Sequence, residues 1–212
     1  LLLYATSHQV RLHHARNAGP WSYLATYEDT HEIVISPRRD LATLRVNGSG
    51  TGPPVFDLVR GDTAYHVRQL FRSYGARFSP NGDTLWMVGV TRGRATPLDP
   101  YPGLLLMMEA KTGRVLRSLE LNDVQPFGFA RDSHQPRLYI YALPNPGTRR
   151  TEELLVLDSR TLEEVGRVAV PAELGCGNNC LSPVIAAGID GVFFVNSRWT
   201  YAFGSRSEWA IP

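Results

Sequence analysis

Residues 76–88 read ARFSPNGDTLWMV, and in this stretch two short apolar runs flank the turn sequence Ser79-Pro80-Asn81-Gly82. Aliphatic and aromatic residues of this kind favour β-strands, and Asn-Gly readily adopts the positive φ angles of a tight hairpin. Pro80 comes just after the first run, where its missing N–H removes no hydrogen bond between strands. The stretch therefore predicts two antiparallel strands joined by a short turn.

The residues that follow extend this hairpin into a unit of four strands. A third apolar run, residues 104–109, ends at an acid, and a turn at Lys111-Thr112-Gly113 leads into an alternating fourth run, residues 115–121. The same order of runs and turns returns over residues 127–170. Weaker copies are found at residues 33–71, at residues 184–203 and, with three runs, at residues 1–27. The chain is therefore a series of similar β units.

The spacing of the units indicates how they are arranged. Ser36 and Ser79 lie 43 residues apart, which is the length of a four-stranded propeller blade. We therefore predict an all-β fold, a β-propeller of about five four-stranded blades or a fragment of a larger propeller. Residues 1–212 are expected to form one domain, with units at approximately 1–30, 31–74, 75–123, 124–172 and 181–212.

Two phrases resemble the repeats of a known class of propeller. FSPNGDTLW, residues 78–86, and LLVLDSRTLE, residues 154–163, are similar to YVTN-type and WD40-like β-propeller repeats. The resemblance is good over residues 76–170. It implies an extracytoplasmic protein, periplasmic or secreted, that binds another protein or belongs to a multi-subunit assembly.

Composition excludes several classes of protein. With 43% hydrophobic and 20% charged residues, the chain has the composition of a globular protein. Its net charge of +2 is too small for the basic footprint of a nucleic-acid-binding protein. No apolar run approaches the eighteen or so residues of a membrane helix, so we expect no transmembrane segment. The first residue is Leu1 and not Met, from which we expect a processed or partial chain.

The two cysteines, Cys176 and Cys180, are separated by three residues. A pair this close can form a local disulfide, bind a metal with outside ligands or remain reduced. The disulfide is the favoured interpretation, because a closed zinc site needs about four ligands and the nearest donors are the amides of Asn178 and Asn179. A disulfide would indicate an oxidising compartment.

No motif predicts a catalytic residue, a cofactor or a metal site. The six histidines never show the His-x-x-x-His spacing of a zinc protease, and no Gly-x-Ser-x-Gly nucleophile motif occurs. The glycine-rich run at residues 48–52 lacks a following Lys-Ser/Thr pair and leads into Pro53-Pro54, so we interpret it as a loop.

Two groups of residues are candidates for binding. Arg77, Arg131 and Asp190 end or follow predicted inner strands, so they are expected to line the central channel. There they either form a site or cap the channel through contacts with water and backbone. Tyr101 lies in a proline-rich loop and Arg149-Arg150 in a second loop, and these are candidate contacts for a partner.

Three functions are compatible with these features. The favoured hypothesis is a non-catalytic interaction module, an accessory or scaffold subunit of a larger complex. The alternatives are a propeller hydrolase, lactonase or lyase with a metal at the channel mouth, and a carbohydrate-binding propeller.

Independently of function, strand alternation predicts a set of residues that are buried between blades. They are Phe78, Leu85, Met87, Leu106, Leu138, Ile140, Leu155 and Leu157.

Overall fold

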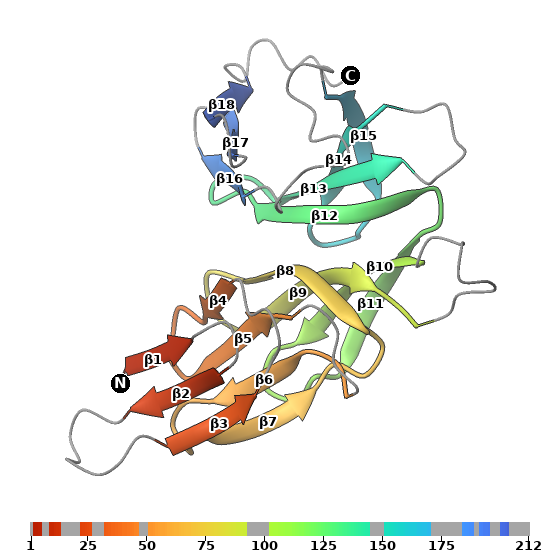
Figure 1. Ribbon diagram of the computed structural model, residues 1–212. Coiled ribbons are helices and arrows are strands. Elements are labelled where there is room, and N and C mark those ends of the chain that lie inside the picture. Colours follow the sequence, from red (N-terminus) through yellow and green to blue (C-terminus); the bar gives the residue numbers. More distant parts are fainter. Residues whose placement is uncertain are drawn as a thin grey trace. The chain divides into compact units, whose positions relative to one another are not determined.

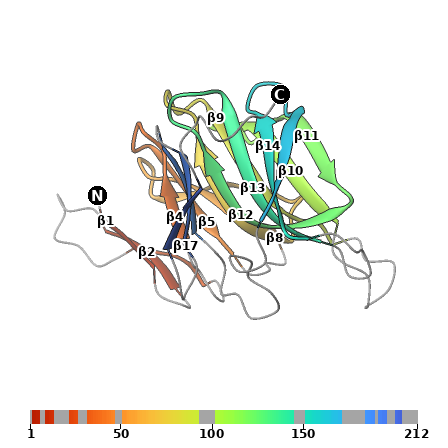
Figure 2. The same cartoon turned by 90° about the horizontal axis from the view of Figure 1, so that it is seen from above.

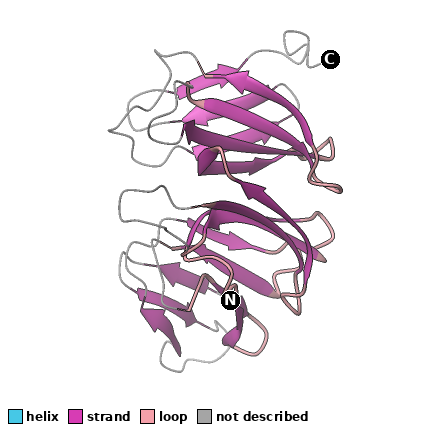
Figure 3. Ribbon diagram, turned by 90° about the vertical axis from the view of Figure 1, so that its right-hand side faces the viewer, coloured by secondary structure: helices cyan, strands magenta, loops and turns pink. Residues whose placement is uncertain are grey.

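The structure is a computed structural model of the 212-residue chain. It describes residues 32–46, 51–92, 102–144 and 151–170 in full, and the backbone of six further strands. These are β1 (Leu2–Ala5), β2 (Gln9–His13), β3 (Ser22–Thr26), β16 (Val184–Gly188), β17 (Gly191–Val195) and β18 (Thr200–Phe203). The described residues form strands and turns without a helix, as Figure 3 shows, and the predicted all-β class is confirmed.

Three four-stranded antiparallel sheets form the central part of the sequence (Figure 1). The β4 sheet contains β4 (Glu32–Ile35), β5 (Leu41–Arg45), β6 (Pro54–Asp57) and β7 (Asp62–His66). The β8 sheet contains β8 (Arg72–Phe78), β9 (Thr84–Val90), β10 (Gly103–Glu109) and β11 (Val115–Leu121). The β12 sheet contains β12 (Val124–Arg131), β13 (Arg137–Pro144), β14 (Glu153–Asp158) and β15 (Glu164–Ala169). In each sheet the strands lie side by side in sequence order, and β1–β3 and β16–β18 form three-stranded sheets of the same kind.

The chain divides into two compact units. Unit 1 comprises residues 1–92 and 106–116, and unit 2 comprises residues 93–105 and 117–212. The β4 sheet and strands β8 and β9 belong to unit 1, whereas the β12 sheet belongs to unit 2. Figure 2 shows the long strands β12 and β13 of unit 2 side by side, as their pairing from Val124–Pro144 to Arg131–Leu138 requires.

The turn between the first and second strands has the same hydrogen bonds in the three sheets. The N–H groups of Ser36, Ser79 and Asp132 donate to the carbonyl oxygens of Leu41, Thr84 and Arg137, over 2.9, 2.8 and 3.0 Å. In the two Ser-Pro turns the serine hydroxyl oxygen also accepts a hydrogen bond from the backbone N–H of Leu41 or Thr84. The serine that precedes proline in the sequence repeat therefore stabilises the turn that starts the second strand.

The turn between the third and fourth strands also repeats. The N–H groups of Gly61, Gly113 and Leu162 donate to the carbonyl oxygens of Asp57, Glu109 and Asp158, over 2.8, 2.9 and 2.9 Å. The three donor residues have positive φ angles of 77°, 71° and 64°. Two of them are glycine, for which this conformation carries no steric cost, and the third is a buried leucine.

The core lies in the middle strands of each sheet. All eight residues predicted to be buried are buried, from Phe78 at 7% exposure to Leu85, Met87, Leu138, Ile140 and Leu157 at 0%. Their neighbours on the opposite strand face are buried as well, including Trp86, Val88, Tyr139 and Tyr141. The middle strands are therefore covered on both faces, so apolar residues run continuously along them and do not alternate with polar ones.

Candidate functional site

Two charged side chains are buried among the described residues, Asp132 and Arg45. Asp132 stabilises its own turn: its Oδ1 accepts hydrogen bonds from the N–H groups of His134 and Gln135, and its Oδ2 accepts one from the Tyr139 hydroxyl. Arg45 is different, because it ends a middle strand, where burying a charge is costly unless other groups stabilise it.

Arg45 also departs from the repeat. It is the ninth residue after Ser36, and the ninth residues after the equivalent Ser79 and Asp132 are Val88 and Tyr141, both uncharged and buried. Arg45 thus places a charge at a repeat position that is uncharged and buried in the other two sheets. Departures of this kind from the pattern of a fold are expected at functional sites. Arg45 is therefore the starting point for the candidate site.

Four side chains from neighbouring strands surround Arg45 in unit 1. Glu32 on β4 is its partner in the β4–β5 register, and β8, which contacts both strands, contributes Arg72, Tyr74 and Arg77. The Arg45 Cζ lies 5.8 Å from the centroid of the Tyr74 ring, within cation–π range. We call Glu32, Arg45, Arg72, Tyr74 and Arg77 the arginine cluster.

Two further contacts connect the cluster. The Nη1 of Arg77 lies 2.7 Å from the Oε1 of Glu32 and also donates to the carbonyl oxygen of Ala76. The Nη1 of Arg72 donates to the Tyr74 hydroxyl over 3.4 Å, a long hydrogen bond. Two guanidinium groups thus contact the Tyr74 side chain, and the third forms an ion pair with the one carboxylate of the cluster.

Hydrogen bonds from the backbone and the hydroxyl of Ser73 hold β8 in place beside the end of β5. The Ser73 N–H donates to the carbonyl oxygen of Val46 over 3.2 Å, and the Ser73 Oγ accepts from the Val46 N–H over 3.1 Å. The Ser73 hydroxyl donates in turn to the carbonyl oxygen of Leu44 over 3.3 Å. Because Ser73 is buried and lies between Arg72 and Tyr74, these bonds fix the position of both cluster residues.

A β-bulge at Tyr74 determines how β8 presents its side chains. The β8–β9 pairing steps from Ser73–Gly89 to Gly75–Val88, which leaves Tyr74 as the extra residue. Glycine is required at position 89, because a Cβ there would clash with the carbonyl oxygen of Arg72. The bulge re-aims the side chains on either side of it, as bulges near binding sites commonly do.

The bulge belongs to the repeat, whereas the arginines do not. Phe127 is the extra residue in the equivalent bulge of β12, between Pro126 and Gly128. The positions of Arg72 and Arg77, counted back from Ser79, correspond to Gln125 and Ala130, counted back from Asp132. Each of the three arginines therefore stands where the β12 sheet has an uncharged residue.

The electrostatics of the cluster favour an anion. Burial lowers the pKa of Arg45; Glu32 and Tyr74 oppose this effect, and Arg72 and Arg77 add to it. A guanidinium nevertheless stays protonated in proteins, so the three positive charges persist. The side chains of Arg77 and Glu32 are 25% and 35% exposed, so solvent reaches the cluster.

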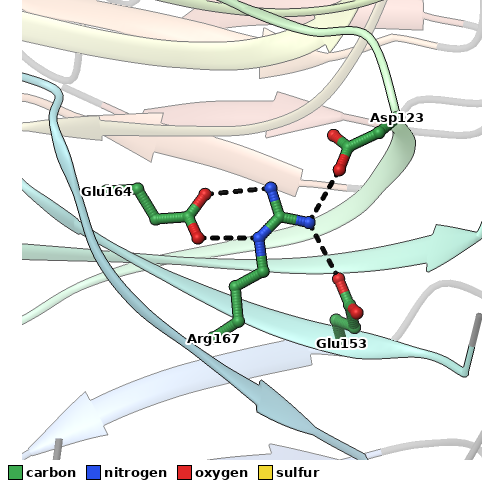
Figure 4. A network of polar contacts seen from close by, with 4 residues as sticks. All are labelled: Asp123, Glu153, Glu164 and Arg167. Carbon is green, nitrogen blue, oxygen red and sulfur yellow. Dashed lines mark hydrogen bonds and ion pairs between the residues drawn. The ribbon is translucent and has the colours of Figure 1, made fainter.

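A second polar network lies in unit 2 and braces the β12 sheet (Figure 4). Arg167 on β15 forms ion pairs with Asp123 at 2.8 Å, Glu153 at 3.0 Å and Glu164 at 2.7 Å. The hydrogen bonds to Glu164, and then those to the other two carboxylates, raise the pKa of Arg167. Because Arg167 is surrounded by carboxylates from the turn before β12 and from two strands, this network stabilises the sheet.

Comparisons with known proteins identify the architecture. No protein-family model matches the chain, and no curated protein matches it. Among solved structures, the β-propeller domain of Cps50 (Swd1) from Myceliophteria thermophila is 9% identical, with a TM-score of 0.59 over 91% of this chain and 62% of that one. The RRP9 WD40 repeats are 13% identical, with a TM-score of 0.52 over 78% and 44%. The fold is that of a β-propeller.

A third match is hydrazine synthase of Kuenenia stuttgartiensis, 14% identical, with a TM-score of 0.59 over 89% of this chain and 55% of that one. This chain spans between 44% and 62% of the lengths of these three structures. At these identities the likeness establishes the fold alone. The resemblance to propeller repeats predicted from the sequence is confirmed at the level of the fold.

The propeller structure places two of the predicted channel residues. Arg77 is brought together with Glu32 and Arg45 in the arginine cluster. Arg131 is the half-buried last residue of β12, where burial lowers its pKa and the neighbouring Asp132 opposes that shift. That they line a central channel stays a prediction.

The other predicted site residues lie outside the described residues. They are Tyr101, Arg149, Arg150, Cys176, Cys180 and Asp190. Within the described residues, no three His, Cys, Asp or Glu side chains are grouped so that they could hold a metal ion. The same part of the chain contains no helix long and apolar enough to cross a membrane.

Sequence reasoning missed Arg45, Arg72 and Tyr74. The signal that could have revealed Arg45 was present, because aligning the repeats on Ser36, Ser79 and Asp132 shows a charge where Val88 and Tyr141 stand in the other sheets. The convergence of β5 and β8 is a tertiary property that local patterns do not contain.

Proposed function

We propose that this chain is a non-catalytic interaction module that binds another protein, as an accessory or scaffold subunit of a larger assembly. The arginine cluster carries the proposal. Its three arginines occupy positions that are uncharged in the β12 sheet. Two of them, Arg45 and Arg72, contact Tyr74, and the third, Arg77, is partly open to solvent. Arg and Tyr are among the residues that contribute most binding energy at protein interfaces.

At two sheet edges the structure argues against another way of binding a protein segment, which is to add a strand to the edge. The fourth strands β7 and β15 are such edges, but each carries a β-bulge. Ala64 and Val165 are the extra residues, and both are exposed. Bulges twist an edge away from regular pairing, so these edges are protected against strand addition. Protection of these two edges favours binding through side chains, such as those of the cluster.

Native pull-down with matched variants tests the proposal. Tagged wild-type protein expressed in its source should retain a partner in a fixed ratio after washing, with mass spectrometry identifying the partner. Arg77→Gln should lose it, because the substitution removes a cluster charge. Arg117→Gln, at an exposed position on β11 outside the cluster, should retain it. A wild-type protein that elutes alone, or an Arg77→Gln variant that retains the partner fully, would contradict the proposal.

We further propose an extracytoplasmic location, on the basis of the resemblance to YVTN-type repeats and of the cysteine pair. Fractionation of the source cells checks it. The protein should be recovered with periplasmic or secreted markers, and recovery with cytosolic markers would refute the location without affecting the interaction proposal.

A further inference from the structure

We propose that the arginine cluster binds a dianionic tetrahedral oxyanion, a phosphoryl group or the free phosphate or sulfate ion. This inference rests on the proposed function, because it names the chemical group that the same site would take. The argument proceeds from the donors of Arg72 and Arg77 and from the charge of the cluster.

Arg72 has N–H donors that the described residues leave unsatisfied. A guanidinium carries five N–H donors, and the Arg72 group uses one of them in the 3.4 Å hydrogen bond to the Tyr74 hydroxyl. Its Nε is buried and has no hydrogen-bond partner within the described residues, and no ion pair of Arg72 occurs there. The four N–H donors on the two terminal nitrogens share this single long hydrogen bond, and an oxyanion there would supply acceptors for the other three.

Arg77 presents the second set of donors. Its Nη1 is held by Glu32 and by the carbonyl oxygen of Ala76, which fixes the plane of the guanidinium. Its other nitrogens make no further hydrogen bond within the described residues. A planar fork with two adjacent donors matches the oxygen spacing of a phosphoryl group, to which arginine binds in a bidentate manner.

The charge of the cluster selects a dianion over a monoanion. Within the described residues the cluster contains three guanidinium groups and one carboxylate, an excess of two positive charges. A phosphate or sulfate group balances this excess, whereas a single carboxylate leaves one positive charge over. The lowered pKa of Arg45, caused first by burial and in part by Arg72 and Arg77, is consistent with this excess.

Isothermal titration with inorganic phosphate tests the inference on the full chain, at constant ionic strength and with sulfate and acetate as comparison ions. Arg72→Gln is the informative variant, because the next sheet has glutamine at the equivalent position, Gln125. Arg117→Gln is the control outside the cluster. Arg72→Lys, which keeps the charge and loses the fork, serves as a second variant should Arg72→Gln not fold.

We expect wild-type protein and Arg117→Gln to bind phosphate alike, and Arg72→Gln to bind on the order of tenfold or more weakly, the effect of losing a charge-assisted contact. Arg72→Lys should also bind more weakly, and acetate should bind at least about tenfold more weakly than phosphate. Equal affinities of wild-type protein and Arg72→Gln, equal affinities for acetate and phosphate, or no phosphate binding would overturn the inference.

A further titration, with a phosphoserine peptide, distinguishes a phosphoryl group on a partner protein from the free phosphate ion. Tighter binding of a phosphoserine peptide than of inorganic phosphate would assign the group to a partner protein, and equal binding would assign it to the free ion. Failure of the oxyanion inference is distinguishable from failure of the proposed function. In the first case phosphate does not bind but the partner is still captured and is lost in Arg77→Gln; in the second, phosphate binds but no partner is retained.

Discussion

A substitution at Gly113 tests two features at once, the positive φ angle that the repeated turn requires and the packing of one sheet against the next. Gly113 adopts a φ of 71° in the turn before β11, and a Cβ placed there would lie 2.6 Å from Cδ2 and Cε2 of Tyr65. Tyr65 belongs to β7 of the preceding sheet, and its hydroxyl donates to the carbonyl oxygen of Ala110 over 2.7 Å. Gly113→Ala therefore perturbs the backbone and displaces the ring at once.

The expected cost has two parts. The left-handed conformation costs an alanine about 1 kcal/mol relative to glycine. Moving the Tyr65 ring away from the new methyl group breaks its hydrogen bond to Ala110, which adds about 1 kcal/mol, and loses some packing between the sheets. We expect Gly113→Ala to lower the free energy of unfolding by about 2–3 kcal/mol in urea denaturation.

Two variants separate these parts. Gly61 occupies the equivalent turn with a φ of 77°, so Gly61→Ala should show the backbone cost of about 1 kcal/mol. In a Tyr65→Ala background, Gly113→Ala should also cost only about 1 kcal/mol, because the ring is absent. A cost of Gly113→Ala that is the same with and without the Tyr65 ring would refute the reasoning.

Four further predictions concern the core, the turns, the ion network and the cysteines. Leu155→Ala should lower the free energy of unfolding by about 2–5 kcal/mol, and a loss below about 0.5 kcal/mol would place Leu155 on the surface. Leu162→Gly should lower the free energy of unfolding by about 1–2 kcal/mol, because losing the buried side chain costs more than is gained by relieving the strain of a leucine at a φ of 64°. A variant that is more stable than the wild type would show that the backbone strain is the larger effect. Arg167→Ala should lower the thermal midpoint, because it leaves three carboxylates without the cation that they share, whereas Arg117→Ala on β11 should not; equal midpoints of the two variants would count against the network. Cys176 and Cys180 should resist alkylation in native, unreduced protein, and two labelled thiols in the mass spectrum would exclude the disulfide.

The parts of the fold that depend on local sequence were predictable. The Ser-Pro and Asn-Gly turns indicate where strands end. The 43-residue spacing from Ser36 to Ser79 predicts units of the length of a propeller blade. The predicted burial of Leu85 and Ile140 is correct, but alternation is the wrong reason for it, because Trp86 and Tyr139 on the other strand face are buried too. A local pattern cannot show that a strand is covered on both faces.

The site was less predictable than the fold. Arg77 was identified as a candidate from its place near the end of an inner strand, yet its partner Glu32 lies on a different sheet, 45 residues away. Arg45 and Arg72 meet only because Ser73 joins β8 to the end of β5 and a bulge at Tyr74 re-aims the strand. Neither the bulge nor the contact between sheets has a signature in the residues next to it.

Arginine footprinting tests most directly whether the cluster is the surface that this propeller uses. The chain alone and the chain in its native assembly are labelled with an arginine-specific dicarbonyl reagent, and the labelling rate of each arginine is measured by mass spectrometry. The account predicts that Arg72 and Arg77 are labelled more slowly in the assembly, while Arg117 is labelled at the same rate in both. Unchanged labelling of Arg72 and Arg77, with protection of arginines elsewhere in the chain, would contradict it.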